Sequence, residues 1–269
     1  MLFEYETLEK AQLIKRPSKS IKSPYIADII INGVEDLAHC PSLGVSGLLN
    51  TECEFYVSVS NNEKRKSKYT VELINAPSSK NTYTITNTNP QMGNIMFENL
   101  LKNNYLPDYI NYKSYKREKT IENSRFDFYI IKENGEEEYV EIKSVVLCDY
   151  EKDDYPSYLK PEISEMKTYK KAAIFPDGYR KNKNVPISER AIKHINELGK
   201  LKSEKNISTS LYFIIQRNDC EYFKPSNKDQ FYYEALKQGH KNGVKLKAIS
   251  LEWTQEGICK FNKFVPIVI

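Results

Sequence analysis

The stretch that decides the fold reads Ser124-Arg125-Phe126-Asp127-Phe128, then an Asn134-Gly135 turn, then Val140-Glu141-Ile142-Lys143-Ser144. Two β-rich runs on either side of Asn-Gly predict a hairpin. Within the second run, Glu141 and Lys143 are two residues apart and share one face of their strand. Two carboxylates can hold a hard divalent cation such as Mg²⁺ or Mn²⁺, and a nearby lysine can position or deprotonate an attacking water. The stretch therefore indicates phosphodiester cleavage, with Asp127 and Glu141 as metal ligands and Lys143 as the third catalytic residue.

The hairpin register decides whether Asp127 joins Glu141 and Lys143. A strict two-residue Asn134-Gly135 loop sets Asp127 opposite Ile142, on the wrong face. An odd-length loop or a β-bulge would slip the register by one residue and bring the three side chains together. Because Asp127 alternates with Phe126 and Phe128, we expect it to face away from the side that both rings bury. The alternative interpretation is a surface hairpin whose charged residues are simply solvated.

The composition is that of a folded, soluble protein. The chain has 269 residues, of which 40% are hydrophobic and 12% aromatic, enough for one large domain or two modest ones. No apolar run reaches the roughly 18 residues of a membrane span, and the acidic N-terminus is unlike a signal peptide. These features predict a cytoplasmic location, with the nucleus as the alternative, and no membrane contact.

The cysteines and histidines argue against a sulfur- or imidazole-held metal. The five cysteines are scattered and never spaced C-x-x-C, so neither a disulfide framework nor a structural zinc site is expected. Only three histidines occur. Any metal is therefore predicted to be held by oxygen.

Positive charge is unevenly distributed, although the net charge is only +4. Basic clusters with tyrosines between them suit phosphate contact and base stacking. The candidate nucleic-acid-binding residues in the first part of the chain are Lys15, Arg16, Lys64, Arg65, Lys66 and Tyr69. The alternative is that each cluster is a solvated, lysine-rich loop.

The chain divides into a β-rich first part and a mixed second part. Strands are predicted at residues 25–31, 34–40, 54–60 and 69–74, with a hairpin turn at Asn32-Gly33, so we expect a small barrel or sandwich. The polar stretch 76–81 is the predicted linker between domains 1–80 and 81–269. Beyond it, the predicted elements are a helix at 94–103, strands flanking Asn134-Gly135, a strand at 171–175, a helix at 188–198, a strand at 211–215, a helix at 229–238 and a final strand at 244–253. This order predicts a mixed α/β domain.

Four further residues carry weaker signals. Glu98 edges the apolar side of helix 94–103, so it is either an edge residue or an additional metal ligand. His194 follows Lys193 on a helix face and is expected to be solvated rather than a general base. His39 is either a polar core residue or a phosphate contact. Asp177 lies in a Phe-Pro-Asp-Gly turn signal.

Taken together, these strings resemble the sugar fermentation stimulation protein A (SfsA) family. The matching strings run almost from end to end and include Tyr25-Ile26-Ala27-Asp28, Ala38-His39-Cys40-Pro41, Ser124–Phe128, Val140–Val145, Phe175-Pro176-Asp177 and Ile215-Gln216-Arg217-Asn218-Asp219. The chain resembles a divergent, longer member, with residues 149–170 adding length.

The resemblance implies an α+β protein with an N-terminal OB-like barrel and a C-terminal domain of the PD-(D/E)xK nuclease type. It also implies binding of DNA without strong sequence preference and a regulatory role in sugar use. Asp127, Glu141 and Lys143 match the nuclease core, and Glu98 matches its helix acid. Two other hypotheses for the function stay open, namely a non-catalytic DNA-binding regulator and an RNA-processing or scaffold module. The sequence leaves strand preference and homo-oligomer formation open.

Overall fold

The computed structural model describes residues 1–42, 48–50, 53–62, 64–79, 82–122, 124–150, 170–176, 178, 182 and 184–269. Asp177, named above, lies outside the described residues, as does most of the segment 149–170.

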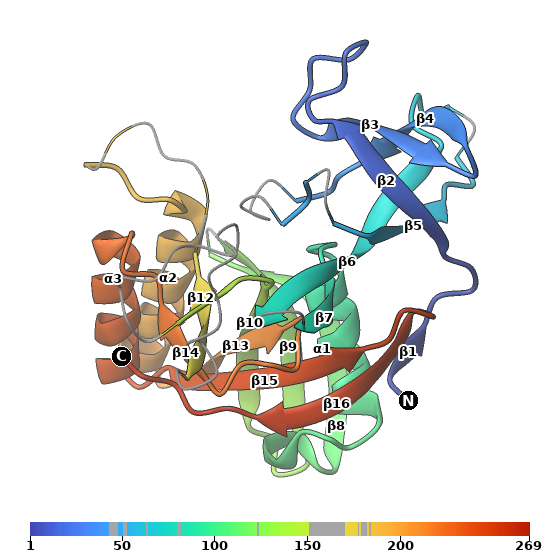
Figure 1. The fold of residues 1–269 in the computed structure, drawn as a ribbon. Helices are drawn as coiled ribbons and strands as arrows, with labels where there is room; N and C mark the ends of the chain where they lie inside the picture. The colour runs from blue at the N-terminus through green and yellow to red at the C-terminus, as the bar shows by residue number, and fades with distance from the viewer. Residues whose placement is uncertain are drawn as a thin grey trace.

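The first part of the chain forms a closed β-barrel (Figure 1). Five strands build it in the order β4–β3–β2–β5–β6, and a parallel pairing of β4 with β6 closes the ring. Their bounds are β2 (Glu9–Lys15), β3 (Ile26–Ile31), β4 (Val34–His39), β5 (Phe55–Val59) and β6 (Tyr69–Ser79). The predicted hairpin is confirmed, because Asn32 and Gly33 both have positive φ, as a type I′ turn requires.

The predicted linker is wrong. Residues 76–79 are the end of β6 and pair with β7 (Thr82–Asn87), where Ala76 lies opposite Thr84. β7 in turn pairs with β15 (Lys245–Trp253), so one sheet of 13 strands runs through the described parts of both halves. The division into domains 1–80 and 81–269 stays a prediction.

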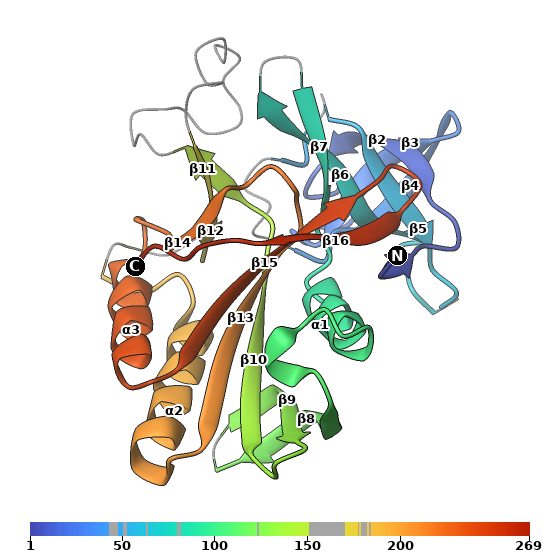
Figure 2. The same ribbon diagram turned by 90° about the horizontal axis from the view of Figure 1, so that it is seen from below.

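The second part is a mixed sheet with helices on both faces (Figure 2). β13 (Ser208–Ile215) runs parallel to β15 on one side and to β10 (Glu137–Val145) on the other. β9 (Ser124–Lys132) and β8 (Tyr112–Ile121) continue the sheet as antiparallel strands. At the other edge, β16 (Ile258–Phe264) pairs with β15 and with β1 (Phe3–Glu4), and a small separate sheet contains β11 (Cys148–Tyr150), β12 (Lys171–Phe175) and β14 (Tyr222–Pro225).

Helix α1 (Met92–Lys102) covers one face of this sheet, while α2 (Glu189–Lys205) and α3 (Gln230–Lys241) cover the other (Figure 2). A short 3-10 helix spans Pro107–Tyr109. Helices α2 and α3 each begin with an N-cap side chain. Ser188 accepts a hydrogen bond from Ala191 N, and Asp229 accepts one from Tyr232 N. The helices therefore bury two separate cores, one on each side of the sheet.

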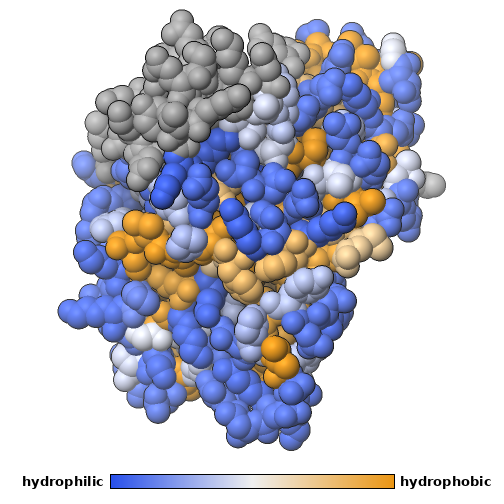
Figure 3. All heavy atoms as spheres, turned by 60° about the horizontal axis from the view of Figure 1, so that its bottom comes forward, coloured by the Kyte–Doolittle hydropathy of each residue, from blue (hydrophilic) through white to orange (hydrophobic). Residues whose placement is uncertain are grey.

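Seven strands were not predicted from the sequence, namely β1, β2, β7, β8, β11, β14 and β16. β8 is largely exposed along its length, so it lacks the alternation by which a half-buried strand is recognised. Figure 3 shows the face that carries β16 and the C-terminal segment, where apolar side chains form a band among polar ones. Exposed apolar residues of these segments include Phe264 and Val268.

Among the described residues, no helix has the length and apolar character needed to cross a bilayer.

Candidate active site

A one-residue slip in the β9–β10 hairpin decides the geometry of the site. Lys132 N donates to Glu136 O at 2.9 Å and Gly135 N donates to Lys132 O at 3.0 Å, which leaves a three-residue loop with Gly135 at φ 83°. Phe128 consequently lies opposite Val140, and the ladder ends one residue before Asp127 and Glu141. The strict two-residue loop is wrong, and the odd-length loop that convergence requires is confirmed.

Asp127 takes the place of a backbone acceptor in the sheet. The β9–β10 ladder ends at the Phe128–Val140 pair. Just beyond it, Asp127 Oδ2 accepts a hydrogen bond from Ile142 N, and Oδ1 accepts one from Asn94 Nδ2 of α1, each at 2.8 Å. The carboxylate is therefore held between two strands and a helix.

The strand is irregular at Asp127, which makes one expectation wrong. Phe126 packs in the core beneath α2, whereas Phe128 packs in the core beneath α1. The two rings therefore do not bury on one side. In the neighbouring strand β8, Glu118 has a φ of 53°, at the point between the residues that pair with Phe126 and Phe128. The local break in alternation turns Asp127 toward β10.

Glu141 is the centre of a buried charged group. The residue is 3% exposed, and Lys143 Nζ lies 2.5 Å from its Oε1. Nδ1 of His194, on α2, contacts the same oxygen. His194 is itself 6% exposed and its ring stands edge-on to Phe126. The solvated interpretations of Glu141 and His194 are therefore wrong.

The two acids are shifted in opposite directions. Burial, followed by the nearby charge of Glu141, raises the pKa of Asp127, although the Ile142 N–H and Asn94 oppose the rise. Burial also acts to raise the pKa of Glu141, but Lys143 and His194 outweigh it and hold that pKa below its usual value. Glu141 is thus the stabilised carboxylate of the pair, and Asp127 is the one destabilised by burial and by the charge of Glu141. A hard cation between them would relieve that repulsion.

Glu98 lies one helical turn after Asn94 on α1 but engages β8. Its carboxylate accepts hydrogen bonds from Tyr115 at 2.6 Å and Arg117 at 3.1 Å, and it pairs with Lys102 at 2.9 Å. Burial acts to raise the pKa of Glu98, yet these partners hold it below its usual value. The α1 residue that the structure places against Asp127 is Asn94. The role of Glu98 as a metal ligand stays a prediction.

The candidate nucleic-acid residues divide into exposed and anchored groups. Lys15, Lys64 and Lys66 are exposed. Arg16 donates to Pro24 O and Ser42 O, and Arg65 donates to Ser60, Ser67 and Thr70. Tyr69 is 6% exposed and packs in the barrel core, so its ring does not offer a face for base stacking.

An exposed aromatic residue that the sequence did not single out lies near the two arginines. Tyr25 is 42% exposed, and its ring stacks on His39 with centroids 6.4 Å apart. His39 is partly buried, and burial together with the charges of Arg65 and Arg16 lowers its pKa. The four side chains thus form a basic and aromatic patch on the barrel, called here the Tyr25 patch.

Three residues of the candidate active site were missed. Asn94 and Tyr232 carry no local signal, and His194 was expected in solvent. Tyr232 is fully buried, its hydroxyl has no hydrogen-bond partner among the described residues, and burial followed by the charge of Glu141 raises its pKa. Each of them reaches the site from a different helix, so only the packing of α1, α2 and α3 on the sheet reveals them.

The fold and site define a class of protein in which an OB-like barrel is joined to an α/β domain that holds a buried carboxylate–lysine group. The family model for the sugar fermentation stimulation protein RE domain matches residues 91–158 and 160–257. The chain belongs to the sugar fermentation stimulation protein family.

Individual relatives match along almost the whole chain. The homolog from Clostridium tetani is 30% identical over 266 residues, 98% of each chain, and the homolog from Acaryochloris marina is 30% identical over 96% of this chain and 92% of its own. The two chains are thus of nearly equal length, so the expectation that this chain is longer than its relatives is wrong in the case of the C. tetani homolog. A solved structure of Pyrococcus furiosus SfsA in complex with Ca²⁺ has a TM-score of 0.78, 21% identity, and coverage of 100% of this chain and 99% of that one. This likeness confirms the fold class.

Proposed function

We propose that this protein binds DNA without strong sequence preference and hydrolyses phosphodiester bonds with Mg²⁺ or Mn²⁺ at Asp127, Glu141 and Lys143. The observation that carries the proposal is the register of the β9–β10 hairpin, which ends at the Phe128–Val140 pair and leaves Asp127 hydrogen-bonded to Ile142 N, near the buried Glu141 and its partner Lys143. A solvated hairpin would not need this register. Desolvated acids with opposite pKa shifts are typical of functional sites.

The donor set fits a hard divalent cation. Asp127 and Glu141 offer carboxylate oxygens. Burial, followed by the charge of Glu141, raises the pKa of Asp127, and a bound cation would offset the repulsion between the two acids. When bound, Mg²⁺ or Mn²⁺ would polarise a phosphate oxygen and activate water. The P. furiosus protein was solved in complex with Ca²⁺, which supports a hard cation as the ion to test here.

The remaining residues position these groups. Asn94 and the Ile142 N–H fix both oxygens of Asp127, and His194 holds Glu141 from α2. Lys143 brings an ammonium group to the same carboxylate, from which it would donate a hydrogen bond to the attacking water or to a phosphate oxygen. The site would thus be ordered before substrate arrives.

DNA binding would use the barrel. The exposed Lys15, Lys64 and Lys66 would contact phosphates, and the Tyr25 patch would offer Tyr25 for base stacking in place of the buried Tyr69. Arg16 and Arg65, which are anchored to the barrel backbone and hydroxyls, would add positive charge beside it.

The test is cleavage of single- and double-stranded DNA, with RNA as a parallel substrate, in Mg²⁺ or Mn²⁺. Asp127→Ala and Lys143→Ala are compared with wild type and with Asp108→Ala, a partly exposed aspartate paired with Lys247. We expect both site variants to lose at least about 10²-fold in rate while Asp108→Ala cuts like wild type. Absence of cutting by wild type, with salt-sensitive DNA binding intact in every variant, would overturn the enzyme and leave a non-catalytic DNA-binding protein. Cutting of RNA alone would overturn the choice of DNA.

A further inference from the structure

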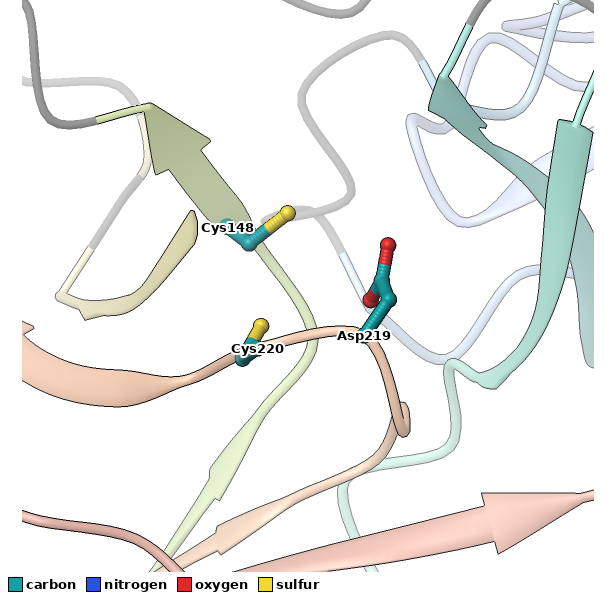
Figure 4. Close-up of side chains that lie close together, drawn as sticks. All are labelled: Cys148, Asp219 and Cys220. Atoms are coloured by element: carbon teal, nitrogen blue, oxygen red, sulfur yellow. The ribbon is translucent and has the colours of Figure 1, made fainter. Parts of the chain in front are cut away.

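A second cluster of potential metal ligands lies outside the candidate active site. Cys148 begins β11, and Asp219 and Cys220 follow each other in the segment between β13 and β14. One ligand atom from each residue lies within 4.8 Å of the other two. Figure 4 shows the two sulfur atoms and the carboxylate gathered between β11 and this segment. Residues 72 positions apart in the chain are thereby brought to one point.

The spacing suits one small cation. A zinc ion holds sulfur ligands at about 2.3 Å, so two tetrahedral sulfur ligands lie about 3.8 Å apart. That separation is within the 4.8 Å span of the cluster. The two thiols are 2% and 0% exposed, while the Asp219 side chain is 13% exposed. The carboxylate therefore marks the side from which an ion and a water would enter.

The carboxylate is already oriented by a shell of donors. Arg217 Nε donates to Asp219 Oδ1 at 2.6 Å and Nη2 donates to Oδ2 at 2.8 Å. Lys171 Nζ donates to Oδ2 at 2.8 Å. Metal-ligating carboxylates are commonly hydrogen-bonded in this way, and such outer donors fix the direction of the free lone pairs.

Charge balance does not oppose an ion here. Arg217 and Lys171 carry two positive charges, Asp219 carries one negative charge and the thiols carry none, which leaves a single net positive charge. A divalent ion that replaces the two thiol protons leaves this net charge unchanged. Each S–H bond breaks, each proton goes to solvent, and a sulfur–metal bond forms in its place.

We propose that Cys148, Cys220 and Asp219 form a site for one thiophilic divalent cation of the Zn²⁺ class, with water as the fourth ligand. Two thiolates select such an ion over Mg²⁺ or Mn²⁺, so this site and the carboxylate pair at Asp127 and Glu141 would not compete for one metal. The site is independent of the proposed nuclease activity.

The site would tie the two halves of the molecule together. Lys171 also donates to Ser78 Oγ at 2.7 Å, and Arg217 Nη2 also donates to Pro77 O at 3.2 Å. Both acceptors are at the end of β6, the barrel strand that extends toward the α/β sheet. A bound cation would therefore stabilise the junction of β6, β11 and the β13–β14 segment, and Zn²⁺ would raise the melting temperature.

The test uses Cd²⁺, whose thiolate complexes absorb in the ultraviolet. We expect wild type to bind one Cd²⁺ per chain with the absorbance of two thiolates, and Cys148→Ser and Cys220→Ser each to lose saturable binding. The matched control is Cys259→Ser, which removes a thiol that is equally buried elsewhere, and Asp127→Ala leaves the band unchanged. Serine variants that titrate like wild type would overturn the proposal.

A second measurement needs no variant. The ¹¹³Cd NMR resonance of the wild-type complex is expected in the range of two sulfur ligands. A resonance in the range of oxygen ligands alone, or a wild type that gives no saturable Cd²⁺ band, would refute the site even where a serine variant does not fold.

Discussion

Gly239→Ala tests how closely α3 packs on α2, the helix that carries His194. A Cβ added at Gly239 would lie 2.6 Å from Ile195 Cγ1 and 2.8 Å from Cδ1. Both distances are shorter than a carbon–carbon contact, and Ile195 is 1% exposed, so it has little room to move. Overpacking of this kind costs about 1–3 kcal/mol, whereas alanine in a helix gains up to about 1 kcal/mol over glycine. We expect a net loss of stability.

Gly199→Ala is the matched control, because it makes the same exchange on α2. Its added Cβ would come no closer than 3.2 Å, to Asn242 Nδ2 at the end of a side chain that can shift. The helix-propensity gain is similar in the two variants and largely cancels in the comparison. Gly239→Ala should therefore be less stable than Gly199→Ala by about 1–3 kcal/mol, or about 2–4 °C in melting temperature per kcal/mol.

The assay is urea unfolding of wild type and both variants, monitored by circular dichroism. The curves are fitted with one common slope m, which is the change in free energy of unfolding per molar urea. Because Ile195 adjoins His194, Gly239→Ala should also lower any metal-dependent cleavage more than Gly199→Ala does. A Gly239→Ala midpoint equal to or above that of Gly199→Ala would refute the inferred close packing of α2 on α3.

Three further predictions concern the charged groups and the barrel. Although burial acts to raise the pKa of Asp219, Arg217 and Lys171 hold it well below its usual value, so its contribution to stability is present above about pH 3.9 and is lost as the pH falls through the lower folded value. The difference in free energy of unfolding between wild type and Asp219→Asn, measured by urea unfolding at a series of pH values, should therefore decrease below that pH. A difference that stays constant with pH would contradict this. Asn94→Ala removes the hydrogen bond to one oxygen of Asp127. The cleavage rate should fall about tenfold or more, while DNA binding measured by fluorescence anisotropy stays unchanged. A cleavage rate equal to that of wild type would argue against the positioning role of Asn94. Tyr25→Ala should weaken single-stranded DNA binding by about 1–3 kcal/mol per stacked base at fixed salt, and unchanged anisotropy titrations would remove the Tyr25 patch from the interface.

Much of the fold could be predicted from short-range patterns. The Asn32-Gly33 turn needs positive φ at both residues, so its position follows from the two residue types alone. Helix α2 was placed by Ala191, Ile195 and Leu198, all of which are buried. The strands β7, β8 and β16 pair with their sequence neighbours β6, β9 and β15, but buried and exposed residues do not alternate regularly along them, so the pattern that marks a half-buried strand is missing.

The candidate site shows the same division. Glu141 and Lys143 were placed on one strand face by their spacing alone, and the structure keeps them together. The position of Asp127 required the loop length, which depends on the conformation of Gly135 rather than on its presence. Asn94, His194 and Tyr232 required the helices to be packed on the sheet.

The amino-acid sequence by itself determined the β-rich first part, the mixed second part, the family and the residues Asp127, Glu141 and Lys143, since each of these follows from local patterns or from strings shared with relatives. Only the tertiary structure decided the continuous sheet through both halves, the burial of Tyr69 and His194, and the meeting of Cys148 with Cys220. The physical reason is that burial and proximity between distant residues depend on how strands pair and helices pack, and no local spacing encodes them.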